Sequence, residues 1–180
     1  EVMRAAVAAG AGLINDVRAL REPDAVETAA ALQVPVCLMH MQGEPRNMQH
    51  YPSYTAVAGE VRDFLQERIK ACVAAGIPRQ RIVIDPGFGF GKTVEHNLEL
   101  LRRLDELRAL GAPILAGLSR KSMIGALLGL PVAQRLQASV ALALIAVQNG
   151  ATILRVHDVR ATREAIRMFE AVYPRTGERA

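Results

Sequence analysis

Short apolar runs alternate with longer amphipathic stretches along the chain. The runs are apolar at consecutive positions, which is typical of strands covered on both faces rather than of half-exposed strands. Turn residues bound each run, and a helical stretch follows it. The runs lie at residues 13–14, 34–39, 82–84, 113–118 and 152–156. This repeated strand-then-helix order predicts a parallel α/β fold.

The amphipathic stretches carry apolar residues three or four positions apart and end at turn residues. Gly76 and Pro78 stop the first long one. Gly111 stops the next, for which Thr93 is the expected N-cap. Ser119 is the expected N-cap of the short helix after the fourth run. The expected helices cover residues 1–9, 57–72, 98–107, 121–128, 136–147 and 165–172.

Two parallel α/β architectures fit this order, a doubly wound sheet and a (β/α)8 barrel. A barrel needs eight units in roughly 250 residues, whereas this chain of 180 residues supplies about five. An expected helix at residues 1–9 leads into the first run, and a missing strand before it is the simplest explanation. We therefore expect an α/β fold, a (β/α)8 TIM barrel with about the last five βα units present, and residues 1–180 forming a single domain.

Polar or chemically useful residues stand at the end of every expected strand. In parallel α/β folds the carboxyl ends of the strands carry the chemistry. One strand that ends this way means little, but five predict a single convergent polar site. The endings are Asn15-Asp16, Met39-His40-Met41-Gln42, Asp85-Pro86-Gly87, Gly117-Leu118-Ser119-Arg120-Lys121, and Arg155 with His157-Asp158.

Structural roles compete with functional ones at several of these endings. Asn15 alone would be a turn former, His40 alone a core histidine, and Lys121 alone a solvated surface lysine. Asp85 is more specific, because a carboxylate at the end of a buried strand needs donors that offset its desolvation. Arg155 lies within an apolar run, so we expect it to be buried and paired with an anion.

A glycine-rich stretch at residues 87–93 follows a strand and precedes a helix, as a nucleotide-binding P-loop does. A Walker A motif needs glycine where this chain has Pro86, and the third glycine of a Rossmann motif comes one residue early. ATP and NAD are therefore poorly supported, and we interpret the stretch as a loop that holds two aromatic rings at the mouth of the site. The histidines and cysteines form no metal-binding motif.

Composition narrows the classes of function. With 51% hydrophobic and 22% charged residues the chain reads as globular, and no run approaches the roughly 20 apolar residues of a membrane span. The net charge is +4, but the basic residues are scattered and only 4% of residues are aromatic, so no nucleic-acid partner is predicted. Cys37 and Cys72 lie in apolar surroundings, and no secretory leader is visible, so we expect a reducing, cytoplasmic setting.

Taken together, the strand endings resemble those of dihydropteroate synthases, and the resemblance runs over essentially the whole chain. Any one matching segment is moderately specific, whereas five in the same order are strongly so. The resemblance implies a TIM barrel that binds a pterin deep in its mouth. The matching segments are Leu13-Ile14-Asn15-Asp16-Val17, Met39-His40-Met41-Gln42-Gly43, Asp85-Pro86-Gly87-Phe88-Gly89-Phe90-Gly91-Lys92, Ser119-Arg120-Lys121-Ser122 and Arg155-Val156-His157-Asp158-Val159.

The resemblance also assigns roles around the pterin. It implies that Asn15 and Asp85 hydrogen-bond the pterin ring. The chemistry agrees, because a carboxylate can accept the pterin's amino group and ring N–H as a fork. The resemblance further implies that Met39 and Gly117 line the pterin slot.

The second substrate and the leaving group are placed by the same resemblance. It implies that Lys121 lies against the pterin and contributes to the aminobenzoate pocket, with Phe90 and Ser122 around the aminobenzoate ring and its carboxylate. Arg155 and His157 would cradle the pyrophosphate, where donors stabilise the charge that grows as it leaves. We therefore expect Lys121, Arg155 and His157 to be catalytic.

The implied reaction is substitution at the pterin methylene carbon, in which pyrophosphate leaves and the amine of p-aminobenzoate attacks. Positioning and charge stabilisation would supply most of the rate. The resemblance also implies Mg2+ bound with the pyrophosphate, although no strong ligand for it stands out here, and a homodimer through helices late in the chain. Residues 132–147 are apolar enough for such an interface, but barrel packing explains them equally well.

The sequence leaves two alternatives open. A methyltetrahydrofolate-dependent methyltransferase would use a similar Asn and Asp pair but would not need Arg155, His157 or Lys121. A non-catalytic pterin-binding fragment also fits, because two mobile loops and a pterin-contacting Asp from the front of the synthases have no counterpart in these 180 residues. Turnover by the chain alone would separate this fragment from an enzyme.

Overall fold

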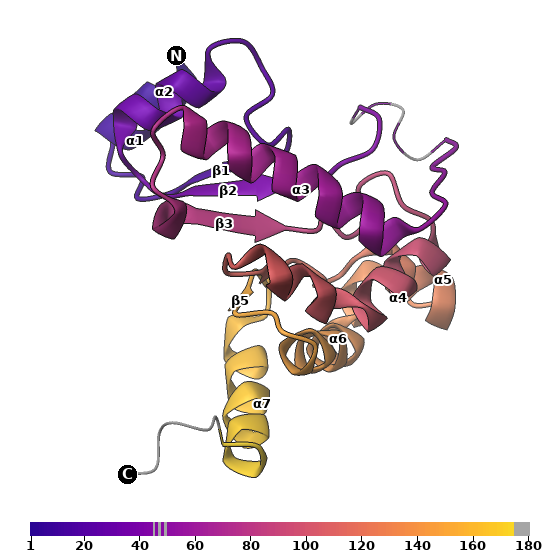
Figure 1. The fold of residues 1–180 in the computed structure, drawn as a ribbon. Helices are drawn as coiled ribbons and strands as arrows, with labels where there is room; N and C mark the ends of the chain where they lie inside the picture. Colours follow the sequence, from indigo (N-terminus) through magenta and orange to yellow (C-terminus); the bar gives the residue numbers. More distant parts are fainter. Residues whose placement is uncertain (45, 47, 49, 175–180) are drawn as a thin grey trace.

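Five short parallel strands, each followed by at least one helix, organise the described part of the chain (Figure 1). The structure is a computed structural model and describes residues 1–44, 46, 48 and 50–174. The strands are β1 (Ile14–Asp16), β2 (Val36–Met39), β3 (Ile82–Asp85), β4 (Leu115–Ala116) and β5 (Ile153–Leu154). The α-helices are α1 (Val2–Ala8), α2 (Ala25–Leu32), α3 (Val57–Ala74), α4 (Val94–Arg102), α5 (Ser122–Leu128), α6 (Leu136–Gln148) and α7 (Val159–Val172). The 3-10 helices are η1 (Arg79–Arg81), η2 (Leu104–Leu110) and η3 (Val132–Gln134).

The strands follow one another in space in the order in which they occur in the chain. β1, β2 and β3 form one parallel sheet, and β4 and β5 form another. A parallel bridge between Ile84 and Ile114 joins the two sheets, so that the five strands form one open arc. This arc confirms the predicted parallel α/β fold and its five βα units, which together make part of a (β/α)8 barrel.

Alternate strand residues face opposite sides of the arc. Val36, Leu38, Ile82 and Ile84 belong to the main core beneath the helices. The intervening positions face the other side, where three buried residues, Cys37, Val83 and Leu115, form a small separate cluster. Because side chains alternate along a strand, Met39 and Asp85, which are paired in register, share this inner side with that cluster.

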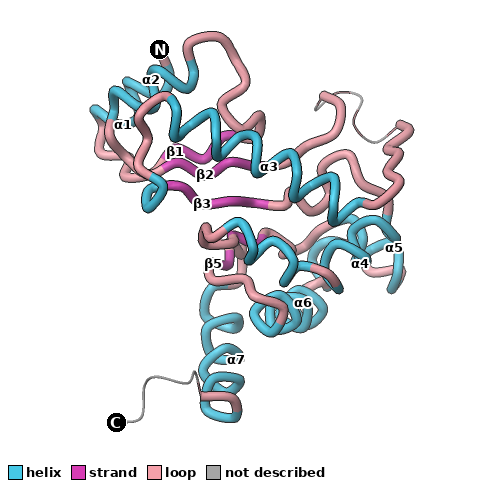
Figure 2. The backbone as a smooth tube through the Cα atoms, viewed as in Figure 1, coloured by secondary structure: helices cyan, strands magenta, loops and turns pink. Residues whose placement is uncertain are grey.

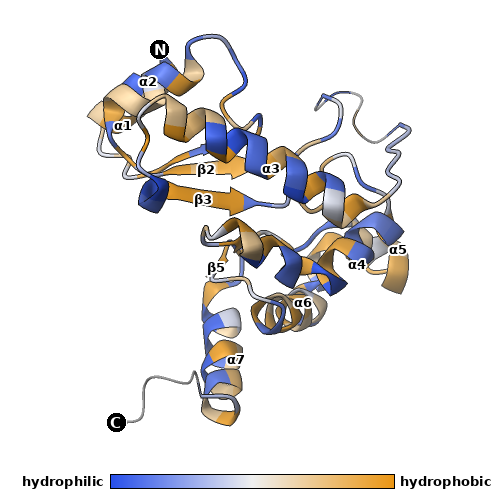
Figure 3. Cartoon of the chain, in the orientation of Figure 1, coloured by the Kyte–Doolittle hydropathy of each residue, from blue (hydrophilic) through white to orange (hydrophobic). Residues whose placement is uncertain are grey.

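Helix α3 shows how the sequence builds the outer layer. Most of its apolar residues recur at helical spacing and are buried, whereas Phe64 is half-buried, Val73 near the end of the helix is exposed, and the remaining positions are mostly polar. Figure 3 shows α3 lying across β2 and β3 with hydrophilic residues on its outer side. The buried residues of α3 are Val57, Ala58, Val61, Leu65, Ile69 and Cys72.

Among the described residues, none of the helices combines the length and the apolar character that a membrane-spanning helix requires.

The helix expected at residues 98–107 is two helices instead of one. Thr93 caps α4 as predicted, because its hydroxyl accepts a hydrogen bond of 3.1 Å from His96 N. However, α4 ends at Arg102, and a 3-10 helix continues to Leu110 before Gly111 turns the chain with φ +62°. At the break, Asn149 Nδ2 donates 2.8 Å to the Leu101 carbonyl, a contact between distant segments that helical periodicity does not reveal.

The last two strands are shorter than predicted. The apolar runs at 113–118 and 152–156 contribute only two strand residues each. β5 pairs with β4 alone, so it is the edge of the arc, and its pattern of exposure differs from that of the fully buried β2 and β3. An apolar run therefore predicted a strand correctly, but it did not distinguish a central strand from an edge strand.

Candidate active site

The segments that follow β2 and β3 extend to one side of the molecule, toward α4 and α5 (Figure 2). Asp85 ends β3 there and is only 8% exposed. Gly87 N donates a hydrogen bond of 2.7 Å to its Oδ1. Burial raises the pKa of Asp85, and the Gly87 hydrogen bond opposes that rise. The positive charges of Lys121, Lys92 and Arg155 oppose it as well, so cations that follow β3, β4 and β5 act on one carboxylate.

Lys121, whose charge acts on Asp85, also contacts the ring of Phe90. The Lys121 ammonium lies 4.3 Å from the centre of the Phe90 ring, which is a cation–π contact. Gly89, between the two phenylalanines of the loop, has φ +77°, and a Cβ there would lie 3.3 Å from Lys121 Cδ. Burial lowers the pKa of Lys121, and nearby Arg155 adds to this effect, whereas Asp85 opposes it. The lysine is therefore half-buried and faces the inner side of the arc, not the solvent.

A set of hydrogen bonds fixes the loop that presents Lys121. Arg120 has the unusual positive φ of 57°, which sets the direction of the chain at Lys121. Arg135 Nη1 donates 3.1 Å to the Arg120 carbonyl and 3.3 Å to the Lys121 carbonyl. Ser139 Oγ accepts 2.9 Å from Arg120 N. The start of α6 thus holds the strained loop in place.

A second set joins this loop to the segment after β5. Arg120 donates through Nη2 to Asp158 Oδ1 at 2.7 Å and through Nε to Oδ2 at 3.1 Å, a two-pronged ion pair. Ser119 Oγ accepts 3.2 Å from His157 N and lies 3.0 Å from His157 Nδ1. The prediction that Ser119 caps the next helix is therefore wrong, because Lys121 occupies the N-cap and the serine hydroxyl binds His157 instead.

Lys92 joins the glycine-rich loop to the end of β2. It is 3% exposed, and its Nζ donates 3.0 Å to the Gly87 carbonyl and 3.2 Å to the Phe90 carbonyl. The same Nζ lies 2.9 Å from His40 Nδ1. Burial lowers the pKa of His40 to about 3, with Lys92 and then Arg21 adding to the effect, so the imidazole is neutral at pH 7.

Glycines allow the loop to approach β2 closely. Gly87 and Gly91 both have positive φ, and a Cβ on either would collide with a backbone carbonyl, that of His40 or of Gln42. In addition, His40 N donates 2.9 Å to the Asp85 carbonyl. Side chain and backbone together therefore fix the ends of β2 and β3 against each other.

A buried acid, three cations that act on it and a tightly packed glycine loop thus lie together near the carboxyl ends of the parallel strands. The model of the pterin binding enzymes matches residues 1–157. The chain belongs to the pterin-binding enzyme family.

Relatives within that family are similar in both sequence and fold. The dihydropteroate synthase of Haemophilus influenzae is 56% identical over 170 residues, which cover 94% of this chain and 62% of the relative. A Xanthomonas albilineans dihydropteroate synthase solved with 4-aminobenzoic acid is 54% identical with a TM-score of 0.90, and the match covers 96% of this chain and 62% of that one. The Yersinia pestis synthase solved with a sulfonamide drug is 53% identical with a TM-score of 0.90, covering 93% and 61%. The chain therefore spans about three fifths of the length of these relatives.

Most of the residues predicted for the pterin-binding site lie along the inner side of the arc. Met39 is 4% exposed and is paired in register with Asp85. Gly117 follows β4 directly and is half-buried, and Ser122 is the exposed first residue of α5. Asn15 pairs with Cys37 on the inner side but is exposed, because β1 is the other edge strand.

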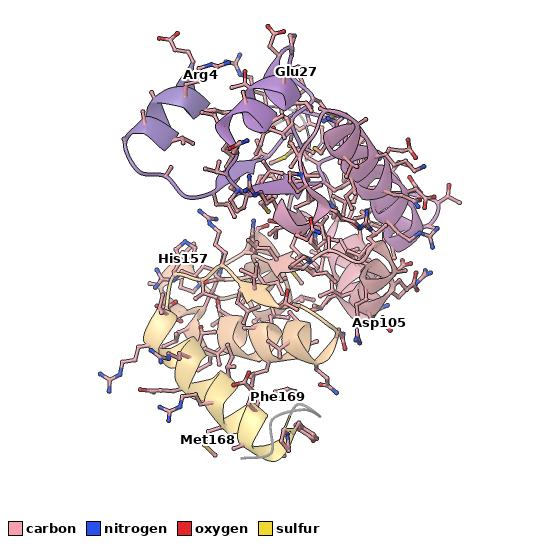
Figure 4. All side chains as sticks on the ribbon, turned by 60° about the vertical axis from the view of Figure 1, so that its left-hand side comes forward. Arg4, Glu27, Asp105, His157, Met168 and Phe169 are labelled. Carbon is pink, nitrogen blue, oxygen red and sulfur yellow. The ribbon has the colours of Figure 1, made fainter. Side chains whose placement is uncertain are left out.

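The prediction that Arg155 is buried within a strand is wrong. β5 ends at Leu154, and Arg155 is exposed, with its backbone N donating 3.1 Å to the Ala116 carbonyl. His157 is exposed too, and Figure 4 shows it beside the start of α7. The reason is the edge position of β5, which leaves these residues without a covering strand in the described part of the chain. Arg155 still acts electrostatically on Asp85 and Lys121, so it belongs to the site, although at its exposed rim.

The sequence did not identify Lys92 as a site residue, although Lys92 ends the glycine-rich segment that resembles the dihydropteroate synthases. Its burial depends on a contact with His40, which follows β2 and lies 52 positions earlier, and a single lysine beside glycines gives no signal of that contact.

Metal binding is a separate question. Within the described residues, no three side chains among His, Cys, Asp and Glu are grouped so that they could hold a metal ion.

Proposed function

We propose that the protein is a dihydropteroate synthase, which condenses 6-hydroxymethyl-7,8-dihydropterin diphosphate with p-aminobenzoate to give 7,8-dihydropteroate and pyrophosphate. The observation that carries this proposal is the buried Asp85, which lies among cations from three successive strand ends. A further structure of the Xanthomonas synthase contains 7,8-dihydropteroate, the product of this reaction. That relative covers the same fold with 53% identity.

Asp85 suits the pterin. A pterin presents an exocyclic amino group and a neighbouring ring N–H, which a carboxylate accepts as two parallel hydrogen bonds. The Gly87 hydrogen bond to Oδ1 fixes the carboxylate, and Met39 beside it supplies an apolar wall. Asn15 offers a further amide on the same side of the arc, where it would meet the pterin ring edge.

Lys121 and Phe90 suit the second substrate. Their cation–π pair places a positive charge and an aromatic face together, which match the ring and the electron-rich groups of p-aminobenzoate. Ser122 begins the next helix and offers its hydroxyl and backbone N–H to the substrate carboxylate. Gly117 leaves the adjoining strand end without a side chain, which keeps the slot open.

Arg155 and His157 suit the diphosphate. Both are exposed, as expected for the binding of a highly charged and hydrated group; Arg155 acts electrostatically on Lys121, and His157 is hydrogen-bonded to Ser119 in the same loop. The bond between the pterin methylene carbon and the diphosphate oxygen breaks, and both its electrons leave with pyrophosphate. The amine then forms the new C–N bond and releases a proton to pyrophosphate or water. Donors from Arg155, His157 and Lys121 stabilise the charge that develops on the leaving oxygen.

Three accompanying features form part of the proposal. Magnesium would be carried by the diphosphate oxygens rather than by side chains of this chain. The protein would act in the cytoplasm, which is supported by the free thiols of Cys37 and Cys72.

A second copy of the chain would bind through α6 and the preceding η3, where Ile145 is 42% and Val132 54% exposed. Sedimentation of wild type and of the Ile145→Glu variant tests this dimer.

Turnover is the experiment that tests the function. The purified protein is incubated with the pterin diphosphate and p-aminobenzoate, and dihydropteroate is followed by chromatography beside a calorimetric titration with the pterin diphosphate. Asp85→Asn should greatly reduce turnover and weaken the binding of the pterin diphosphate. Asp105→Asn is the matched control, because Asp105 is exposed on η2, on the outer side of the molecule (Figure 4). Saturable binding without turnover would support the alternative of a non-catalytic pterin-binding fragment, and the absence of both would contradict the proposal.

A further inference from the structure

Lys92 is the least expected charge in the molecule. It is 3% exposed, whereas lysines are almost never fully buried unless they are paired. Its ammonium has three hydrogens and three acceptors, namely the Gly87 carbonyl, the Phe90 carbonyl and His40 Nδ1, at 3.0, 3.2 and 2.9 Å. Every hydrogen is therefore used, and none is left for a substrate. The residue acts through its neighbours.

Those neighbours are the parts of the site that contact the substrates in the proposed function. Gly87 N donates to Asp85 Oδ1, and its carbonyl accepts from Lys92, so one peptide segment links lysine and carboxylate. Phe90, whose carbonyl Lys92 also holds, supplies the ring beneath Lys121. Through His40 the same ammonium is anchored to β2, whose backbone already pairs with Asp85.

The contact with His40 requires a particular protonation state. The lysine is a donor only, so His40 Nδ1 accepts and its proton resides on Nε2. The low pKa of His40, about 3, is consistent with a ring that stays neutral. The ring is held edge-on to Phe64, with centroids 5.0 Å apart, so it is oriented from both sides. The anchor is thus a fixed neutral acceptor, not a second charge.

A methionine would fill the same space without the desolvation that a buried ammonium suffers. Burial lowers the pKa of Lys92 to about 7, with the charge of Asp85 opposing and that of Lys121 reinforcing the shift. The charged groups that act on Asp85 are Lys121, Lys92 and Arg155. Of these, Lys92 is the most buried, so solvent screens its charge the least.

We propose that Lys92 is a positioning residue that locks the loop from Gly87 to Phe90 onto His40 and supplies the buried positive charge that keeps Asp85 ionised. The identity of the ligand as a pterin rests on the proposed function. The effect on Asp85 itself does not, because it is a property of the protein without ligand.

The test follows the Asp85 carboxyl carbon by NMR during a pH titration without substrate. Asp85→Asn identifies the signal. In Lys92→Met the pKa of Asp85 should rise by about one unit or more, because a nearby positive charge is lost. Leu100→Ala is the control, since Leu100 is fully buried on α4 and its truncation destabilises the fold without changing a charge. An Asp85 pKa that stays unchanged in Lys92→Met, or rises equally in Leu100→Ala, would overturn the proposal.

The unmodified protein gives a second measurement, which two substitutions at His40 then sharpen. As Lys92 loses its proton near pH 7, the Asp85 signal should shift a second time, and the shift should disappear in His40→Leu if the anchor is needed. His40→Asn, whose side-chain oxygen can replace Nδ1 as acceptor, should restore it. A single titration step for Asp85 in the wild type would contradict the proposal. Failure of pterin binding alone would count against the proposed function and leave this result intact.

Discussion

The centre and the two edges of the strand arc differ in how deeply they bury the site residues near their strand ends. On β2 and β3, in the centre, Met39 and Asp85 are 4% and 8% exposed. On β1 and after β5, at the edges, Asn15 and Arg155 are exposed. All four sit near the carboxyl ends of parallel strands, so their position along the strand does not explain the difference.

The number of neighbouring strands explains it. β3 has β2 on one side and the segment that leads into β4 on the other, so packing and the Lys92 contacts fix its end. β5 pairs with β4 alone, and polar links, the Arg120–Asp158 pair and the Ser119–His157 hydrogen bond, fix the segment after it. The pterin end of the proposed site is therefore held by packing and the Lys92 contacts, and the diphosphate end by an ion pair and a hydrogen bond.

Truncating one apolar strand residue in each region should give the largest difference in the free energy of unfolding. Ile84→Ala, at a fully buried position of β3, should lower the free energy of unfolding by about 3–4 kcal/mol. Ile153→Ala on β5, where the side chain is 38% exposed, should lower it by about 1 kcal/mol or less. Urea unfolding followed by circular dichroism measures both. Similar losses would mean that the edge strand is packed as tightly as the centre.

The next largest effect should come from the central acid. Asp85→Asn replaces one acceptor oxygen of the pterin fork by a donor, and we expect the affinity for pterin to fall about 100-fold, since a hydrogen bond to a charged group contributes about 1.5–3 kcal/mol. The loss should be the same for bare pterin and for its diphosphate. Calorimetry with both ligands measures it, and an affinity that matches the wild type would remove Asp85 from the pterin site.

At the edge, Arg155→Ala should discriminate between the two ligands. We expect roughly a tenfold loss of affinity for the diphosphate and little change for bare pterin, because an exposed guanidinium contributes chiefly through its charge. The loss should shrink at high salt. Arg4→Ala, on α1 at the top of Figure 4 and away from β3 and β5, is the matched control. Equal losses for both ligands would give Arg155 a structural role instead.

The smallest effect, taken per unit of pH, concerns the protonation of His40. Because the pKa of His40 falls from 6.5 to about 3 on folding, the unfolded chain binds its proton first as the pH drops. Stability should therefore decline from pH 6.5 toward pH 3, by about 1 kcal/mol between pH 6 and pH 5. The matched variant is His40→Asn, which lacks the titrating imidazole. The raised pKa of Asp85 acts on stability in the opposite direction, but Asp85 is present in both the wild type and the variant, so the difference between their stability curves isolates the contribution of His40. Parallel stability curves in urea would contradict this assignment.

Much of the fold follows from local sequence. Runs of apolar residues located all five strands, and the spacing from Val57 to Cys72 located the longest helix. Thr93 and Gly111 marked a helix start and a stop correctly, because capping and positive φ depend on nearby residues only. The alignment of polar residues with strand ends also identified the region of the site.

What could not be predicted depends on contacts between distant segments. The buried ammonium of Lys92 is hydrogen-bonded to His40, and the hydroxyl of Ser119 accepts a hydrogen bond from His157. Arg155 is exposed because β5 is an edge strand, and no residue near it in the sequence indicates that position. Each of these is decided by which strand lies beside which. Periodicity and motif spacing contain no such information.

The two buried cysteines have a practical consequence. Cys37 lies on the inner side of β2 and Cys72 on the buried side of α3, and both are free and fully buried. Burial raises the pKa of the Cys37 thiol to about 12, with Asp85 adding to the effect, and burial also raises that of Cys72. Since only a thiolate reacts quickly with alkylating reagents, neither sulfur reacts while the fold is closed. The protein therefore carries two native reporters of its own opening, one on each face of the central strands.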